Sequence, residues 1–132
     1  MPTKTIIKPA GAAPALGPYN HGVRAGDFLF CAGQIPIDPA HPSGPLPSDI
    51  QAQTERVLQN IQIILADQRL TFGDVVKTTV FMTNLGDFAP MNAVYSKFFT
   101  SDHPARSTVQ VAALPRGAQV EIEVVAHYSG KE

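Results

Sequence analysis

The strictest constraint on the fold is the alternation of apolar and polar residues near the C-terminal end, from Ala118 to His127. Valine, isoleucine and alanine occupy every second position there, and the positions between them include Glu121, Glu123 and His127. A period of two places successive side chains on opposite faces of a strand. The segment therefore predicts a β-strand with one buried face and one face that carries carboxylates.

Two segments have the periodicity of amphipathic helices. A helix of about 20 residues is expected from Ser48-Asp49-Ile50-Gln51, which has the capping-box pattern with serine as the N-cap. Apolar residues then recur at i, i+4 and i+7 between Val57 and Leu65. A second helix is expected after Asp87 as its cap, with Pro90 in the first turn, where a missing N–H is tolerated. Both apolar stripes predict helices packed on a sheet.

The remaining strands are short and bounded by turn residues. They are expected at Thr5–Ile7, Gly22–Arg24, Phe28–Cys31, Val75–Met82 and Ser107–Ala112. In the last of these, Val109 and Val111 are expected to face the core. The order β-β-β-α-β-α-β-β predicts an α+β fold, a mixed β-sheet with two helices on one face. We expect a single domain over residues 1–132, since domains commonly have about 100–150 residues.

Several strands are apolar on both faces, although two helices cover one face only. Phe28–Cys31 and Val80–Met82 are apolar throughout, whereas the outward residues of a sheet that faces water are normally polar. Charged residues make up 16% of the chain, below the usual quarter or so. We therefore expect a symmetric homo-oligomer whose sheets face one another, with small-ligand clefts between the subunits.

Composition and motif content disfavour several classes of function. Ten basic and eleven acidic residues give a net charge of -1 without a basic stretch, so nucleic acid and anionic membranes are disfavoured as partners. No apolar stretch approaches the roughly 20 residues that span a bilayer, and the single cysteine, Cys31, cannot form an internal disulfide. The cytoplasm is the expected location. The histidines show no metal-ligand spacing, and no cofactor motif is present, so neither a metal nor a cofactor is predicted.

Arg106 is the side chain best placed to bind a small acid. It follows a proline-alanine pair at the start of a strand, where a rigid backbone can aim the guanidinium at a carboxylate. An ion pair with Glu121 or Glu123 accounts for Arg106 equally well, and these carboxylates could themselves be solvated charges on a strand. Tyr19, which follows a proline in a loop, and Asn92, beside the apolar stripe of the second helix, are further candidates, each with a structural role as its alternative.

Six motifs, in this order and spacing, resemble those of one family. They are Gly17-Pro18-Tyr19, Ala32-Gly33-Gln34-Ile35-Pro36, Val76-Lys77-Thr78-Thr79-Val80-Phe81, Asn92-Ala93-Val94-Tyr95, Pro104-Ala105-Arg106-Ser107, and Leu114-Pro115 through Glu121-Ile122-Glu123. Any one of them is a weak signal, but together they cover nearly the whole chain. The chain resembles the RidA/YjgF family of reactive-intermediate deaminases.

The resemblance implies a chorismate-mutase-like α+β fold and a homotrimer whose sheets form a central barrel, with a site in each cleft between subunits. It also implies two catalytic residues: Arg106, which binds the substrate carboxylate, and Glu121, which positions the hydrolytic water. The substrate-binding residues that it implies, through side chains or backbone groups, are Tyr19, Gly33, Asn92, Arg106 and Thr108.

Two positions depart from the family pattern. Ala32 stands where many deaminases of the family carry serine before the glycine of this motif, so a hydroxyl that could bind the substrate or the water is absent. Thr108 stands where many carry cysteine, so a thiol is absent. The backbone roles expected of Thr108 and Gly33 are unaffected. The first departure bears on the activity, whereas neither bears on the fold.

The predicted reaction is the hydrolytic deamination of reactive 2-imino or enamine acids, such as 2-iminobutanoate and 2-iminopropanoate, to 2-oxo acids and ammonia. A protonated imine is already electrophilic, so orientation, a bound water and charge complementarity suffice and no cofactor is needed. Ala32 favours an alternative, a non-catalytic ligand-binding or stress-protective, chaperone-like module. A third hypothesis, an endoribonuclease or translation inhibitor, lacks support from a basic groove with stacking aromatic residues.

Overall fold

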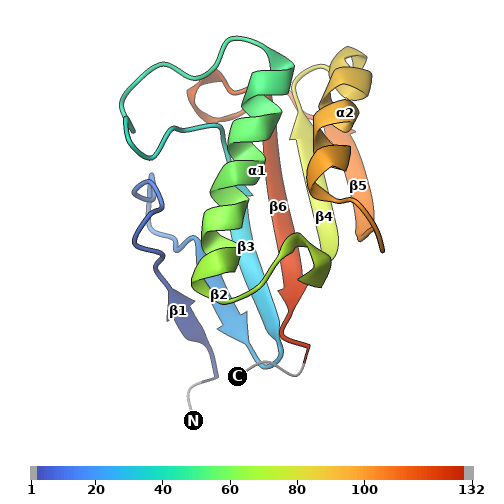
Figure 1. Cartoon of the computed structure of the whole chain (residues 1–132). Helices are drawn as coiled ribbons and strands as arrows, with labels where there is room; N and C mark the ends of the chain where they lie inside the picture. The colour runs from blue at the N-terminus through green and yellow to red at the C-terminus, as the bar shows by residue number, and fades with distance from the viewer. Residues whose placement is uncertain (1–2, 130–132) are drawn as a thin grey trace.

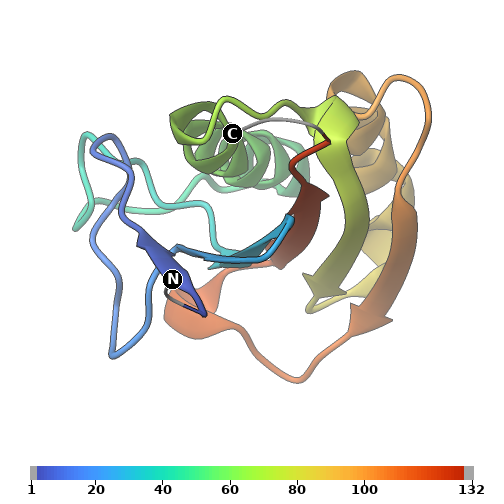
Figure 2. The same cartoon turned by 90° about the horizontal axis from the view of Figure 1, so that it is seen from below.

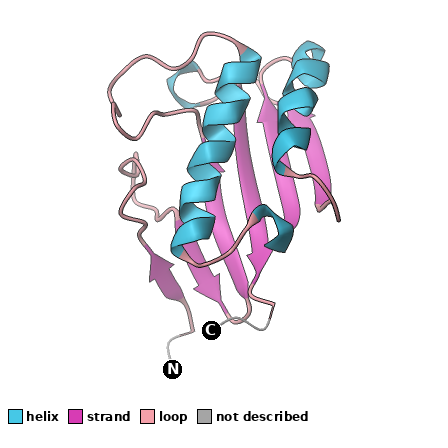
Figure 3. Ribbon diagram, viewed as in Figure 1, coloured by secondary structure: helices cyan, strands magenta, loops and turns pink. Residues whose placement is uncertain are grey.

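Six strands form one sheet in the computed structural model of the chain, which describes residues 3–129 (Figures 1 and 3). The strands are β1 (Thr5–Ile7), β2 (Gly22–Ala25), β3 (Phe28–Gln34), β4 (Val75–Met82), β5 (Ala105–Gln110) and β6 (Val120–His127). The helices are α1 (Ile50–Asp67) and α2 (Phe88–Phe98), joined to the strands partly through short 3-10 turns. The predicted α+β class and the mixed sheet with two helices are confirmed.

The strand order is β1-β2-β3-β6-β4-β5, so β5 lies at one edge. β4 and β5 are parallel, as the crossover through α2 requires, and the other neighbouring pairs are antiparallel. The register of β3 against β6 shifts between Cys31 and Gln34. This irregularity falls on the glycine of the Gly-Gln-Ile-Pro motif, where the candidate site residue Gly33 lies.

Helix α1 begins one residue later than the sequence pattern indicated. Its N-cap is Asp49, whose Oδ1 accepts a hydrogen bond of 2.7 Å from the backbone N–H of Ala52. The prediction of Ser48 as the cap was wrong, because the side chain of the next residue, Asp49, accepts the capping hydrogen bond. The helix packs its apolar stripe against the sheet through buried residues that include Val57, Leu58, Ile61, Ile64 and Leu65.

Helix α2 carries the predicted proline in its first turn. Asp87 occupies the N-cap position but makes no side-chain capping bond, so the predicted cap interaction is absent. The turn before the helix is instead closed by Asn84, whose Oδ1 accepts from the N–H of Gly86 at 2.9 Å. The residues that α2 buries against the sheet are Met91, Val94 and Tyr95.

The core lies between the two helices and one face of the sheet. Leu29, Val80 and Ile122, from three neighbouring strands, are fully buried on this helix-covered face. Figure 2 shows α1 and α2 on the same side of the sheet. On the opposite face, here called the open face, Phe28 is 40% exposed and Phe30 is 48% exposed.

The open face also includes Val109, which is 42% exposed and pairs with Phe81. The prediction that Val109 faces the core was therefore wrong, and Val111 lies beyond the end of β5. The opposite side of β5 carries Arg106, because its register partner Thr78 is completely buried on the helix-covered face. The edge strand β5 thus turns Arg106 and Thr108, and not Val109, toward the helix-covered face.

Candidate active site

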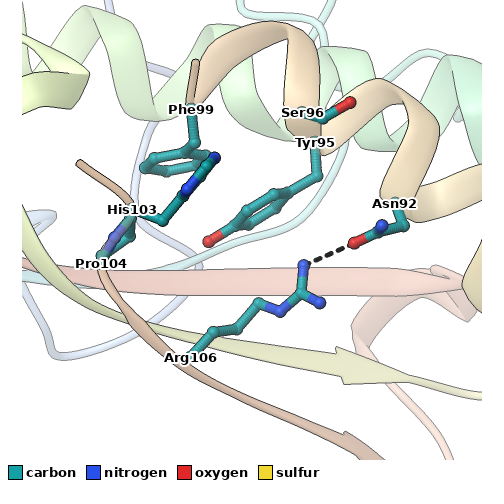
Figure 4. Close-up of a pocket in the computed structure, with 7 residues that line it drawn as sticks. All are labelled: Asn92, Tyr95, Ser96, Phe99, His103, Pro104 and Arg106. Carbon is teal, nitrogen blue, oxygen red and sulfur yellow. Dashed lines mark hydrogen bonds between the residues drawn. The ribbon is translucent and has the colours of Figure 1, made fainter. Parts of the chain in front are cut away.

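Arg106 lies beneath α2, and its guanidinium points toward Asn92 and Tyr95 of that helix (Figure 4). A third side chain of α2, Phe88, also contacts it. Nη1 donates a hydrogen bond of 2.7 Å to Oδ1 of Asn92. The guanidinium carbon lies 4.7 Å from the ring centroid of Tyr95 and 5.4 Å from that of Phe88, which is cation–π distance. Asn92 and Arg106, both predicted site residues, are therefore in direct contact.

A hollow of about 290 Å³ opens beside the guanidinium (Figure 4). Its lining comes from α2, from the loop that follows it and from β5: Asn92, Tyr95, Ser96, Phe99, His103, Pro104 and Arg106. Within residues 3–129, the partners of Arg106 are an amide oxygen and aromatic rings, none of which is negatively charged. The guanidinium therefore borders a small open space, and no negatively charged side chain among these partners balances its positive charge.

Tyr95 is a site residue that the sequence analysis did not identify. Its hydroxyl shares a buried hydrogen bond of 2.8 Å with Oγ1 of Thr78. Burial raises the pKa of Tyr95, against the opposing effects of Thr78 and Arg106, so the phenol is neutral at ordinary pH. The available signal was spacing, since Tyr95 follows Asn92 by three residues and so shares its helix face.

Glu121 lies on the other face of the sheet, the open one. It pairs with Phe81 on β4 while its neighbour Ile122 is fully buried against the helices. Burial, followed by the charge of Glu123, raises the pKa of Glu121, which makes this carboxylate a better proton acceptor near neutral pH. An ion pair between Arg106 and Glu121 or Glu123 does not form within one chain, because the sheet separates them.

Gly33 leaves the space that the Glu121 carboxylate fills. A Cβ built on Gly33 would overlap Oε2 of Glu121. The sequence analysis expected backbone groups of Gly33 to contact a ligand; what the structure adds is that the missing side chain lets a carboxylate lie against β3.

Tyr19 lies in the loop between β1 and β2, and it is 43% exposed. Its hydroxyl accepts a hydrogen bond of 3.1 Å from the backbone N–H of Leu16. A small hollow between this loop and the end of β3 has both Tyr19 and Gly33 in its lining. His21 borders the same hollow and ties the loop to the sheet, with Nε2 2.6 Å from the carbonyl oxygen of Ala13 and Nδ1 3.1 Å from Nε2 of Gln34.

Thr108, two residues beyond Arg106, also faces the helices. Its Oγ1 is buried and has no hydrogen-bond partner among residues 3–129. An unpaired buried hydroxyl is uncommon, since such groups are normally satisfied.

The described residues provide no cluster of three His, Cys, Asp or Glu side chains that could hold a metal. In the same part of the chain no helix is long and apolar enough to cross a membrane.

The predicted site residues therefore form two groups. One, on the helix-covered face, contains Arg106, Asn92 and Thr108, and the other, around the end of β3, contains Tyr19, Gly33 and Glu121. The structure brings the members of each group together but does not bring the two groups together in one chain.

Comparison with known proteins identifies the family. The family model described as Endoribonuclease L-PSP matches residues 10–128. The 2-iminobutanoate/2-iminopropanoate deaminase of Escherichia coli K12 is 44% identical over 127 residues, which are 94% of this chain and 97% of that protein. The chain belongs to the RidA/YjgF family.

Two other RidA/YjgF relatives are similarly close. Protein DfrA of Myxococcus xanthus is 50% identical over 117 residues, 87% of this chain and 88% of that one. The crystal structure of TdcF from E. coli with bound serine superimposes with a TM-score of 0.87 at 43% identity, covering 93% of this chain and 98% of that chain. The YjgF-like architecture expected from the six motifs is thus confirmed, while the roles of the individual site residues stay predictions.

Proposed function

We propose that this chain hydrolyses reactive 2-imino acids, among them 2-iminobutanoate and 2-iminopropanoate, to 2-oxo acids and ammonia without a cofactor. The observation that carries the proposal is the unmatched guanidinium of Arg106 beside an open hollow. Partly buried charges are normally paired, so this one favours an anionic ligand, and a carboxylate matches the guanidinium fork in a bidentate geometry. The deaminase relative at 44% identity supports the same chemistry.

The proposed site is completed by a second copy of the chain. Arg106 and Glu121 lie on opposite faces of one sheet, so a carboxylate bound by the first and a water held by the second are separated within a single chain. A neighbouring copy that brings its Glu121, Gly33 and Tyr19 to the β5 edge removes this separation. The proposed assembly is a homotrimer in which the open faces form a central barrel and the sites lie between subunits.

The exposed apolar residues of the open face support this assembly. Phe28, Phe30 and Val109 are 40%, 48% and 42% exposed, respectively. Their burial against other copies contributes about 25 cal/mol per Å² of apolar surface. Light scattering should give three chains per particle, and Phe30→Asp should dissociate it; a wild-type protein that is monomeric at micromolar concentration contradicts the assembly.

The mechanism uses orientation and one proton acceptor. Arg106 holds the substrate carboxylate, and the Glu121 carboxylate of the neighbouring copy takes a proton from a water whose oxygen bonds to the imine carbon. The proton then passes from Glu121 to the nitrogen of the tetrahedral adduct. The C–N bond breaks with its electron pair on nitrogen, and the hydroxyl proton leaves with it as the carbonyl forms. Iminium and water thus give a 2-oxo acid and ammonium.

A trapping assay tests the proposal. An amino-acid oxidase acting on alanine releases 2-iminopropanoate, which semicarbazide traps, and an active deaminase lowers the rate of semicarbazone formation. Arg106→Ala should lose this effect while keeping the same far-UV circular dichroism and particle size. Arg116→Ala is the matched control, because Arg116 donates to the carbonyl oxygens of Pro42 and Gly44, outside both groups of site residues. Full activity of Arg106→Ala contradicts the mechanism.

Ala32 supports the second candidate, a module that binds 2-oxo acids without catalysis. Its side chain offers no hydroxyl where many deaminases of the family carry one. Binding of pyruvate that depends on Arg106, together with no effect in the trapping assay, would favour this candidate, and Ala32→Ser should then introduce activity. For either function the proposed location is the cytoplasm, which suits a chain with one buried cysteine.

A further inference from the structure

Three side chains contact the guanidinium of Arg106, namely Phe88, Asn92 and Tyr95, and a fourth, Thr78, is hydrogen-bonded to Tyr95. We refer to these four side chains as the Arg106 cradle. Phe88, Asn92 and Tyr95 follow one another at i, i+4 and i+7 on α2, which places them on one face of the helix. Thr78 is the register partner of Arg106 on β4, so both side chains leave the same face of the sheet. The cradle is thus built jointly by a helix and a neighbouring strand.

Tyr95 is the most firmly held member of the cradle. Its hydroxyl is hydrogen-bonded to Thr78 at 2.8 Å, and its ring is stacked on Phe99 with centroids 4.4 Å apart and planes at 24°. The side chain is 5% exposed. With the ring and the hydroxyl both engaged in the core, the ring offers Arg106 a platform of fixed orientation.

This platform and the amide of Asn92 together restrict the guanidinium. A ring face 4.7 Å from the guanidinium carbon holds the position of the planar group, and the bond of 2.7 Å from Nη1 to Asn92 limits its rotation. Bidentate recognition of a carboxylate requires such a defined edge of N–H groups. Without the ring, Arg106 keeps its charge but samples other orientations.

We propose that Tyr95, held by Thr78, is a positioning residue for carboxylate recognition and acts through Arg106. The inference rests on the proposed function, in which Arg106 binds the substrate carboxylate. It assigns to α2 a role in selectivity. The cradle favours a planar anion over a neutral group of the same shape, because a correctly oriented guanidinium forms stronger, charge-assisted hydrogen bonds with the anion.

Binding of pyruvate and of its neutral analogue pyruvamide, followed by NMR titration of the full chain, tests this role. Tyr95→Leu should weaken pyruvate binding about tenfold and leave pyruvamide binding nearly unchanged, so the ratio of the two affinities falls. Tyr95→Phe keeps the ring but loses the hydroxyl, and should lower the ratio by about threefold. Phe98→Leu is the matched control, because it removes an aromatic ring of α2 that packs on Phe72, at 5.5 Å, outside the cradle.

The outcomes separate this inference from the proposed function. If Arg106→Ala leaves pyruvate affinity unchanged, the proposed carboxylate site is wrong whatever Tyr95 does. If Arg106→Ala removes the preference for pyruvate but Tyr95→Leu retains it in full, the positioning role is wrong and the proposed function stands. Should Tyr95→Leu not fold, Tyr95→Phe and Thr78→Val each have to lower the ratio, and an unchanged ratio in either variant overturns the inference.

Discussion

The carboxylate of Glu121 lies over the backbone of Gly33, in space that any side chain at position 33 would occupy. The contact falls where the register of β3 against β6 shifts, between Cys31 and Gln34. Gly33 is not among the residues with positive φ. The requirement for glycine here is therefore one of space, and the Glu121 carboxylate sets it.

Gly33→Ala should displace the Glu121 carboxylate. The new methyl group would overlap Oε2, and the backbone or the glutamate has to move. Because misplacement of a catalytic group by about 1 Å can cost 10²-fold in rate, we expect imine hydrolysis to fall by about that factor. Overpacking should lower the free energy of unfolding by about 1–3 kcal/mol, measured by urea denaturation.

Gly11→Ala is the control for this substitution, since a Cβ on Gly11 would meet only Cγ2 of Ile63, at 3.5 Å and outside both groups of site residues. Adding Glu121→Ala to Gly33→Ala should restore much of the lost stability, because the two side chains then no longer compete for one space. Additive effects of the two substitutions would show that the overlap is not what destabilises Gly33→Ala.

The elements and their order follow from the sequence because each has a periodicity of its own. The alternation in β6 and the stripe of α1 predict which residues are buried, and both predictions are confirmed. Which face of β5 is turned toward the helices could not be predicted from the sequence. A short edge strand has too few residues to define its inner face, and here the apolar Val109 is exposed while the polar Arg106 faces the helices.

The sequence predicts the candidate site as a set of residues but not as a geometry. Six motifs pointed to Arg106 and Glu121, yet no local pattern shows that the sheet separates them. That separation depends on the pairing of β4 with both β5 and β6, which is a long-range property. Tyr95 was missed because an aromatic residue on an apolar helix stripe has the pattern of a core residue, and its contact with Arg106 depends on tertiary packing.

The pKa of Glu121 predicts a pH-dependent stability. Burial and the charge of Glu123 raise it in the folded chain, so folding favours the protonated form. This contribution is present below the unfolded pKa, 4.5, and is lost as the pH rises through the higher folded value. The free energy of unfolding of Glu121→Gln should therefore increase relative to that of wild type as the pH rises from 4 to 7. Thermal and urea unfolding should show the same trend.

Glu123→Gln provides the check on this prediction. Removing the neighbouring charge lowers the pKa of Glu121, so the pH window in which Glu121→Gln gains stability should shift downward in the Glu123→Gln background. A stability difference that is the same at pH 4 and pH 7 is incompatible with a raised pKa.

Cys31 should be chemically inert in the folded protein. It lies 6% exposed on β3, and burial raises its pKa to about 12. Since the thiolate is the reactive form, iodoacetamide should leave the native chain unmodified at pH 8 and should alkylate it fully in 6 M guanidinium, as mass spectrometry would show. Rapid labelling without denaturant would contradict the buried position.

Thr108→Val should stabilise the chain, and a second threonine on the same face of the sheet provides the comparison. Oγ1 of Thr108 is buried without a partner among residues 3–129, whereas the buried hydroxyl of Thr78 is bonded to Tyr95 at 2.8 Å. An unpaired buried hydroxyl carries a desolvation penalty of about 1–3 kcal/mol, so its replacement by methyl should raise the free energy of unfolding by about 1 kcal/mol. Thr78→Val should lower that free energy by a similar amount, because it removes the buried hydrogen bond to the Tyr95 hydroxyl. If Thr108→Val is instead destabilising by urea denaturation, the hydroxyl has a partner that one chain does not supply, and a second copy at the β5 edge is where it would lie.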